Sequence, residues 1–578
     1  IGLVTNPYNN LLEFQNGTNP RSPDTGDPPP AGSITIGPGP VLGVINGVTN
    51  YEEFTDWTFD DLVVLDEYEG DGPNNQQGDL YIAGDGFDSS RDLVAFYARD
   101  GGPADGHFYF RVDFHDLQAL AEEGNLDLYV IIDTGNPASG ELALPDEVDA
   151  GTDNRWEVVV AVFQSNLGRV YVDTDPGNNT TIIGQSLSSR GVETRDQGHP
   201  AGFQEAYFNS TLDAVEFSIS RQALFDGGWN GFSVDDLNFQ VFSVKDGTCN
   251  GCNGGFPGGG DIGGRNDIRD TIYDDDAAED YWQAQSSIKN ILSAWFNTAT
   301  FAGRTKVSTI VHEAEPDRPG SYVQDRINNG AGAGYHRTLA VHDVYDAPLN
   351  VHITPTLASA IEWARVDPAH GTPWRDGPAF NAHLAELTAS NVVDLMGTTF
   401  SDHLLSYFTF EYNRDNEDLA RTFIETIYTM SYDKNDMVFY PPQRVLDPDV
   451  FNKISDMGYS YTLIDQFQHM WIWEGRQTAL GNDGYRINRF HGVNCFIVNE
   501  QANNFRYANH DSGLSMSLRR LFNRKARSGT QDQVVVLLSD WEEFGNAGNA
   551  NGYEANIRWI ANRPWTHLVT LESIAAGE

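Results

Sequence analysis

Basic residues are scarce in this sequence. Its 578 residues include 36 Lys and Arg against 83 Asp and Glu, which gives a formal net charge of −47. Because nucleic acids, anionic polysaccharides and anionic membranes bind to basic surfaces, this balance argues against all three as partners. A neutral glycan is not repelled by such a surface. The charge favours solubility and is typical of adaptation to salty water, but it does not indicate a fold.

Cysteine is also rare, and three cysteines cannot form a metal site of four thiolates. Cys249 and Cys252 form a Cys-x-x-Cys motif in a glycine-rich stretch. A small disulfide, a redox pair and no function all remain open for this motif, and we favour the disulfide. Cys495 lies in an apolar run over 493–497, which predicts a buried strand and an inert core thiol.

Long hydrophobic runs are missing as well. No apolar segment approaches the roughly 20 residues needed to cross a bilayer. The chain starts at Ile1 and not at methionine, which fits either a removed signal peptide or a trimmed chain. From the acidity, the few cysteines and the domain layout, we expect a secreted or extracytoplasmic protein. The sequence leaves its oligomeric state open.

Apolar material is plentiful, with 40% hydrophobic and 12% aromatic residues, so the chain can build true cores. Its length exceeds the roughly 250–300 residues at which a single core stops growing. The composition changes at a glycine-rich stretch after residue 246, which marks a domain boundary. We therefore expect a β-sandwich over 1–246, a linker over 247–270 and a catalytic domain over 271–578.

The N-terminal half has short alternating runs separated by Asp, Gly and Asn turns, which predicts the β-sandwich. The clearest expected strands and helices cover 80–83, 107–112, 116–123 (helix), 126–132, 156–162, 221–225 (helix) and 237–242. Acidic clusters such as Asp60-Asp61, Asp66-Glu67 and Asp173 to Asp175 have the oxygen ligands that Ca²⁺ prefers. Solvated acidic turns are the simpler interpretation of these clusters. Exposed aromatic residues of this module could bind glycan.

After a helical pattern over 288–296, apolar strands alternate with helical patterns from residue 306 onward, which predicts a parallel α/β barrel or open sheet. The expected strands and helices cover 307–312, 349–354, 355–364 (helix), 417–430 (helix), 461–465, 495–499, 514–526 (helix) and 534–540. His312, Asp465, Asn499 and Asp540 each follow an apolar run. In a parallel barrel such positions open onto the C-terminal face, where active sites are built.

Five segments of this half occur in a specific order. They are VHEAEP at 311–316, NVHITPTL at 350–357, DHLLS at 402–406, FYPPQRVLDPDV at 439–450 with MGYSYTLID at 457–465, and VVVLLSDWEEFG at 534–545. Together they resemble the sequence regions of glycoside hydrolase family 57. The fourth and fifth segments are the most specific, and the first departs from the family pattern at Ala314 and Glu315. The N-terminal half loosely resembles the β-sandwich accessory modules of secreted amylolytic enzymes.

The family resemblance implies a distorted (β/α)7-type barrel and a retaining α-glycoside hydrolase acting on an α-glucan or another α-linked polysaccharide. It implies that no cofactor is required, while Ca²⁺ remains an option as a structural ion. Asp540 matches the acid/base of the family. Its alternative role is an N-cap after a strand, which Asp favours in any case.

Gln443 stands where the family has its nucleophilic glutamate. A retaining glycosidase needs a carboxylate here, and a carboxamide is a very poor nucleophile. We interpret the residue as a Glu→Gln replacement that disables the enzyme, so the chain as given is expected to be inactive or nearly so. The alternative is a natural, non-catalytic glycan-binding protein that uses the same cleft.

Substrate-binding roles are expected for polar and aromatic residues around the cleft, because histidines bond sugar hydroxyls and tryptophans stack on pyranose faces. These residues are His312, Glu315, His403, Asp465, Trp471, Trp473, Trp541 and Glu543. A third hypothesis is a metal-dependent deacetylase with a related barrel, which needs an Asp and two His around Zn²⁺. Its histidine candidates are His312, His342, His352 and His403.

Overall fold

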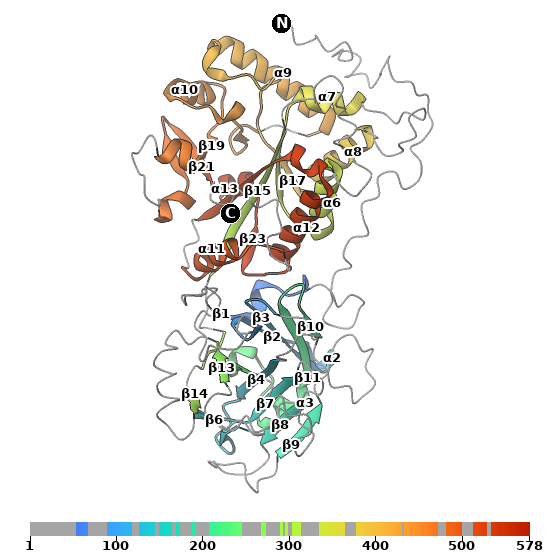
Figure 1. Ribbon diagram of the computed structural model, residues 1–578, viewed down its shortest axis with the longest axis vertical. Helices are drawn as coiled ribbons and strands as arrows, with labels where there is room; N and C mark the ends of the chain where they lie inside the picture. Colours follow the sequence, from blue (N-terminus) through green and yellow to red (C-terminus); the bar gives the residue numbers. More distant parts are fainter. Residues whose placement is uncertain are drawn as a thin grey trace, which may run out of the picture.

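The computed structural model describes residues 54–66, 90–117, 126–144, 150–163, 169–173, 187–191, 207–245, 268–272, 290–292, 295–298, 303–313, 327, 334–363, 377–430, 433–471, 481–499, 513–528 and 533–577. Figure 1 shows an elongated molecule, with antiparallel strands at one end and a sheet surrounded by helices at the other. The expected strand at 80–83, most of the expected helix at 116–123, and both Cys249 and Cys252 lie outside these residues.

The N-terminal part contains three sheets. The five-stranded sheet has the order β1 (Leu62–Leu65), β2 (Leu93–Asp100), β3 (His107–Phe114), β11 (Ala214–Ser220) and β10 (Tyr207–Asn209). The six-stranded sheet has the order β13 (Ile268–Thr271), β12 (Asn238–Lys245), β4 (Leu126–Asp133), β7 (Val158–Phe163), β8 (Arg169–Asp173) and β9 (Leu187–Gly191). The three-stranded sheet consists of β14 (Asn290–Leu292), β6 (Ala150–Trp156) and β5 (Glu141–Ala143).

The two larger sheets share one hydrophobic core. Phe96 and Phe110 of the five-stranded sheet and Val130 and Phe239 of the six-stranded sheet belong to the same buried cluster. The rings of Phe96 and Phe239 lie 5.2 Å apart. Alternate residues of each strand face this core because successive side chains point to opposite faces of a sheet. The helix expected near Arg221 is confirmed as α3 (Arg221–Gly227), which begins after the N-cap Ser220.

The helix expected over 288–296 is wrong. Residues 290–292 form β14, which pairs in parallel with β6, and Phe296 forms a bridge with Phe239. A short apolar run fits a strand as well as a helix, and the long-range pairing decides between them. Because β13 also pairs with β12, the chain remains with the N-terminal sheets up to about Phe296. The change to the barrel comes close to Thr305, later than the expected boundary at 271.

The C-terminal part is built on a nine-stranded sheet. Its main path is β17 (Val393–Leu395), β16 (Leu349–Ile353), β15 (Thr305–Glu313), β22 (Val534–Asp540), β21 (Val493–Val498), β19 (Tyr461–Asp465) and β18 (Val438–Phe439), while β20 (Asn488–Phe490) and β23 (Thr566–Leu568) lie off it. Neighbours on the path are parallel. Gly397, after β17, bridges Phe439 in β18 and so joins the two edge strands. This curled parallel sheet fits the expected α/β barrel.

Helices cover the outside of the sheet (Figure 1). They are α6 (Tyr335–Tyr345), α7 (Pro355–Trp363), α8 (Gly377–Ala389), α9 (Phe410–Tyr428), α10 (Pro448–Asp456), α11 (Met516–Arg527) and α12 (Ala547–Ala561), whereas α13 (Leu571–Ala576) packs against the other face of the sheet. Local signals set their ends: Asp447 accepts hydrogen bonds from the amides of Asp449 and Val450, and Pro448 is the first residue of α10. The expected helices at 355–364, 417–430 and 514–526 correspond to α7, α9 and α11.

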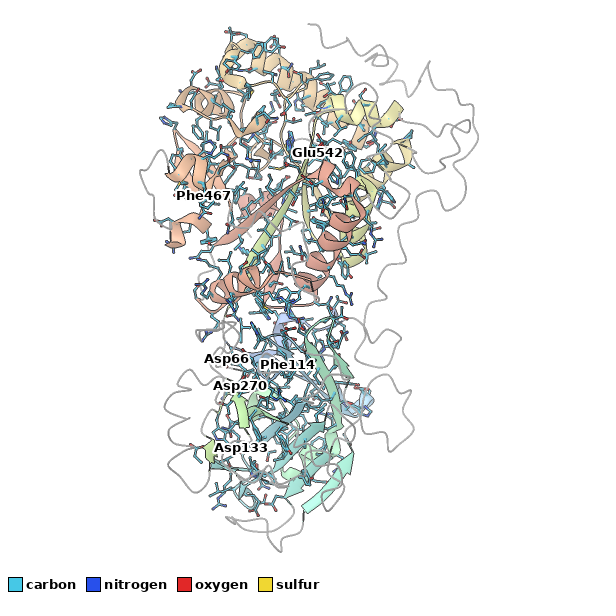
Figure 2. The ribbon with its side chains drawn as sticks, in the orientation of Figure 1. Asp66, Phe114, Asp133, Asp270, Phe467 and Glu542 are labelled. Carbon is cyan, nitrogen blue, oxygen red and sulfur yellow. The ribbon has the colours of Figure 1, made fainter. Side chains whose placement is uncertain are left out.

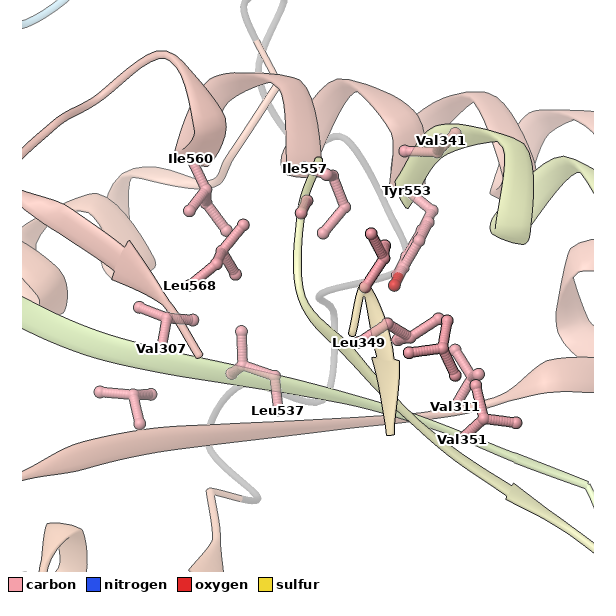
Figure 3. Packing of buried hydrophobic residues seen from close by; sticks show 14 of the residues in the cluster. Val307, Val311, Val341, Leu349, Val351, Leu537, Tyr553, Ile557, Ile560 and Leu568 are labelled. Atoms are coloured by element: carbon pink, nitrogen blue, oxygen red, sulfur yellow. The ribbon is translucent and has the colours of Figure 1, made fainter. Parts of the chain in front are cut away.

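Each barrel strand divides its side chains between two cores. Ile310, Leu463 and Val536 belong to a cluster that includes Leu571 of α13. Val311 and Leu537 face the other way and pack with the helices, as Figure 3 shows for α12. Burial on both faces explains why these strands read as continuous apolar runs. Cys495 is buried on β21, as expected, and burial raises the pKa of its thiol to about 12.

Buried ion pairs link the antiparallel sheets to the barrel. Arg519 of α11 lies 2.7 Å from Asp213, which directly precedes β11, and both side chains are fully buried. Arg111 of β3 donates to the carbonyl of Asn562 at 2.5 Å and pairs with Asp113 at 2.8 Å. Removing one partner of such a pair leaves a buried charge uncompensated. The junction is therefore a buried contact that contains charged groups.

Candidate functional site

Polar side chains meet at the carboxyl ends of the barrel strands. His312 on β15 stands in register with His352 on β16 and with Asp540 on β22. Asp465 is the last residue of β19, and Asn499 directly follows β21. Figure 2 labels Glu542, two residues after Asp540, at the end of the barrel that points away from the antiparallel sheets. The sequence prediction that these strand ends share one edge is confirmed.

Tyr440 occupies the centre of this end. Its ring stacks on His312 with centroids 4.3 Å apart and on His352 with centroids 4.1 Å apart. Burial raises the pKa of Tyr440, so its hydroxyl keeps its proton. Arg444 donates to that hydroxyl at 3.3 Å. No role was predicted for Tyr440 from the sequence, although its place directly after β18 was a usable signal.

The two histidines that stack on Tyr440 are joined to each other by a hydrogen bond. Nδ1 of His312 lies 2.7 Å from Nδ1 of His352, and Nε2 of His352 lies 2.9 Å from the hydroxyl of Thr398. Burial and the nearby charge of Arg444 lower the pKa of His312 to about 3. Burial also holds the pKa of His352 well below its usual value. Both imidazoles are therefore neutral at neutral pH, and they can bond hydroxyl groups without attracting anions.

Arg444 and Asp465 form an ion pair at the same end. Nε of Arg444 lies 2.7 Å from the carboxylate of Asp465, which is 1% exposed. The backbone amide of Asp465 donates to Nδ1 of His469 at 2.8 Å. Burial alone would lower the pKa of Arg444, but Tyr440 and Asp465 raise it, so the guanidinium stays charged. Asp465 thus holds Arg444, and its expected contact with substrate stays a prediction.

Gln443 lies in a strained turn. It belongs to η8 (Pro442–Arg444) and has φ 52° and ψ 14°, and Arg444 follows with φ 51°. Two successive non-glycine residues in the left-handed region cost about 1–3 kcal/mol each. The Gln443 side chain is exposed although Pro441 and Pro442 before it are buried. The turn therefore presents side chain 443 to solvent at the expense of backbone strain.

Asp540 is also presented to solvent. It is the exposed last residue of β22 and the N-cap of η12 (Trp541–Gly545), but its side chain makes no capping hydrogen bond with the described residues. Its charge acts on Tyr440, which places the carboxylate near the stacked rings. The Asp540 carboxylate is thus available for chemistry. Capping of η12 does not explain why an Asp stands at this position.

Of the remaining substrate-binding candidates, two have described side chains and three do not. His403 follows β17, and its two nitrogens lie 2.7 Å from the Asn413 side-chain oxygen and 3.3 Å from the hydroxyl of Ser401. The backbone carbonyl of Glu543 accepts from Asn549 at 3.0 Å. For both residues a contact with substrate stays a prediction. Glu315, Trp473 and the side chain of Trp471 lie outside the described residues.

The expected stacking role of Trp541 must be corrected. Its side chain is 0% exposed and packs on Tyr335 and Phe380, with ring centroids 4.7 and 5.7 Å apart. A sugar ring cannot reach it. A more accessible ring, that of Tyr407, was not predicted from the sequence; it is 78% exposed and lies four residues after His403. Its neighbour Phe408 contacts the His403 ring at 4.8 Å.

Ion binding was the alternative to solvated turns for the acidic clusters, and the deacetylase hypothesis required it of the histidines. Asp61 pairs with Arg99, and Asp173 accepts from the amide of Gly140 at 2.7 Å, so both carboxylates have partners within the protein. His342 lies in α6, where its nitrogens contact Ala347 and Tyr553. In the described part of the chain, no group of three or more His, Cys, Asp or Glu side chains could hold a metal ion.

Comparison with known proteins gives similarities of structure only. No family model and no curated protein matches the chain. Among solved structures, it resembles a 4-alpha-glucanotransferase from Thermococcus litoralis with 16% identity and a TM-score of 0.38, over 48% of this chain and 41% of that chain. It also resembles a GH57-type branching enzyme from Pyrococcus horikoshii (11% identity, TM-score 0.35), over 48% of this chain and 70% of that chain.

A further similar structure is that of a putative polysaccharide deacetylase from Mycobacterium smegmatis (10% identity, TM-score 0.32), over 48% of this chain and 91% of that chain. The match spans less than half the length of the glucanotransferase. GH57 branching enzymes are thus among the structures that this chain resembles, as the sequence motifs led us to expect. Among the described residues, no helix is both long and apolar enough to span a membrane.

Proposed function

We propose that the chain carries the cleft of a retaining α-glycoside hydrolase for an α-glucan or another α-linked polysaccharide. Gln443 occupies the nucleophile position, and Asp540 is the acid/base. The observation that carries this proposal is the pair of solvent-presented side chains at one end of the barrel, one on a strained turn and one on an uncapped strand end. Strain of this kind persists where a side chain must be held in a functional position.

The proposed mechanism needs a carboxylate at 443. Glutamate there would attack the anomeric carbon while Asp540 gives a proton to the leaving oxygen, and the glycosyl ester would then be hydrolysed with Asp540 as base. The amide of Gln443 is uncharged and cannot form this ester efficiently. The adjacent Arg444 guanidinium would keep a carboxylate at 443 ionised. The chain as given is therefore proposed to bind glycan and to cleave little or none of it.

Neutral and aromatic groups around the cleft support a glycan as ligand. His312 and His352 stay uncharged, which suits neutral hydroxyl groups. The exposed ring of Tyr407 suits the C–H face of a pyranose. We further propose that the antiparallel sheets form a β-sandwich accessory module and that the protein acts outside the cytoplasm, in keeping with its net charge of −47.

The second candidate function is a glycan-binding protein without catalysis. Gln443 itself favours it, because an amide at this position preserves the shape of the cleft and removes the nucleophile. Both functions use the same cleft and the same aromatic residues, so only the chemistry at 443 separates them.

The test compares Gln443→Glu with the chain as given on a panel of α-linked polysaccharides. Reducing-sugar release should rise by on the order of 10³-fold or more, because a nucleophile is restored. Gln443→Asn is the matched control, since it changes the side chain but adds no charge. If neither the Glu variant nor the original chain cleaves any glycan, while both bind one in calorimetry, the binding function replaces the hydrolase and Asp540 loses its role.

A further inference from the structure

Three hydrogen bonds form a line from a backbone carbonyl to the candidate site. The hydroxyl of Thr398 donates to the carbonyl of Thr399 at 3.0 Å. The same hydroxyl oxygen lies 2.9 Å from Nε2 of His352, and Nδ1 of His352 lies 2.7 Å from Nδ1 of His312. The line therefore crosses from the segment after β17 to the ends of β16 and β15.

The chemistry of each group determines where the protons lie. A carbonyl only accepts, so the single proton of the Thr398 hydroxyl points to Thr399. Nε2 of His352 must then carry the proton that it shares with Thr398. A neutral imidazole has one ring proton, so Nδ1 of His352 can only accept, and the proton between the two rings belongs to Nδ1 of His312. Nε2 of His312 is left with a lone pair.

We propose that Thr398 and His352 are positioning residues that hold His312 in its Nδ1-protonated form, so that its Nε2 accepts a hydrogen bond from a hydroxyl of the bound glycan. The identity of the ligand rests on the proposed function. The protonation pattern rests on the hydrogen bonds alone and is independent of that function. Within the described part of the chain, Nε2 of His312 makes no hydrogen bond to another residue. The ring of Tyr440 stacks on both imidazoles and keeps their planes in place.

This arrangement gives the site a specificity. An acceptor at Nε2 selects a ligand with a hydroxyl proton to donate, and it repels a carboxylate oxygen, which has none at neutral pH. A deoxy sugar that lacks the hydroxyl loses one hydrogen bond to a buried partner. This loss weakens binding by on the order of 10-fold. Neutral hexose units are therefore favoured over uronic acids at this position.

The proton pattern can be measured in the full-length chain labelled with ¹⁵N-histidine. The two ring nitrogens of a neutral histidine differ strongly in ¹⁵N chemical shift, so NMR identifies the protonated one. His312→Asn assigns the signal. We expect His312 to carry its proton on Nδ1 in the unmodified chain and in Thr398→Ser, which keeps the hydroxyl. In Thr398→Val, which keeps the shape and removes the hydroxyl, we expect a mixture of the two forms.

Glycan binding is the second readout. In the Gln443→Glu background, Thr398→Val should raise KM by about 10-fold. If that variant cleaves nothing, calorimetry should show glycan affinity weakened by about 10-fold. Thr398→Ser should differ from its parent by less than 2-fold. The inference is overturned if His312 carries its proton on Nε2 in the unmodified chain, or if Thr398→Val leaves both the proton pattern and the affinity unchanged. If only the hydrolase proposal fails, the NMR measurement still shows which nitrogen of His312 carries the proton, so the two failures can be told apart.

Discussion

The two ends of the barrel differ in how their ionisable groups are arranged. At the carboxyl end of the strands, Arg444 balances Asp465, and the stacked histidines are neutral. At the opposite end, a cavity of about 430 Å³ is lined by three carboxylates among other residues, those of Asp394, Asp436 and Glu572. One sheet therefore carries a compensated site at one end and crowded negative charge at the other.

The two ends should respond to pH in opposite directions. Burial and the neighbouring carboxylates raise the pKa of Glu572 to about 7, so its stabilising effect is complete below about pH 4.5 and is lost as the pH rises through 7. Burial lowers the pKa of His312 to about 3, so its effect is complete above about pH 6.5 and is lost as the pH falls towards 3. The contribution of His312 to stability is therefore complete at neutral pH, where the ionisation of Glu572 already destabilises the other end.

The largest expected effect lies at the carboxyl end. In the Gln443→Glu background, Asp540→Asn should lower kcat/KM by about 10²–10⁴-fold, because it removes the proton donor to the leaving oxygen. Stability should change by less than about 0.5 kcal/mol, since Asp540 is exposed. Steady-state kinetics and urea unfolding measure the two effects. Glu542→Gln, an exposed change two residues away, is the control, and equal losses in both variants would contradict the role of Asp540.

The ion pair of the carboxyl end can be broken directly. Arg444→Met should lower the free energy of unfolding by about 3–5 kcal/mol, because Asp465 would remain as a buried, unpaired carboxylate. The double variant Arg444→Met, Asp465→Asn should recover most of this loss. Urea unfolding at pH 7 measures both. A double variant as unstable as the single one would show that packing, and not the charge on Asp465, accounts for the effect.

The crowded end can be relieved. Glu572→Gln should stabilise the protein by about 1 kcal/mol at pH 8, after allowance for solvent screening of a partly exposed group. At pH 4 it should have no effect, since Glu572 is then protonated. Unfolding by urea across this pH range measures the difference, with the exposed Glu386→Gln as control. A gain that is equal at both pH values would mean that charge is not its cause.

The smallest effect concerns Tyr407 at the rim of the carboxyl end. Tyr407→Ala should weaken glycan binding by about 2–10-fold, as expected for the loss of one stacking ring, and should leave stability unchanged. Calorimetry with the best polysaccharide of the panel measures it. Phe232→Ala removes a ring that is 89% exposed on the antiparallel part of the chain and shows whether that part also binds the glycan. If Tyr407→Ala binds as tightly as the unmodified chain, stacking at Tyr407 is excluded.

Local patterns predicted most of the barrel and part of its site. The runs that became β19 and β22 have the expected bounds, because strands buried on both faces must be apolar throughout. The polar residues after them reach the same edge because parallel strands end together. Residues 290–292 were misjudged because a short apolar segment becomes a strand only when a partner such as β6 is available.

The sequence by itself determined barrel strands such as β19 and β22, the polar residues at their ends, and that residue 443 is an amide within a glycosidase-like motif. Tertiary structure alone decided that Trp541 is buried and that Tyr407 is exposed, because both depend on which helix or loop covers a ring. It also decided the contact of Tyr440 with both histidines and the hydrogen bond between the two imidazoles. The contacts among Tyr440 and the two histidines join residues about 40 to 130 positions apart, and no local pattern encodes such contacts.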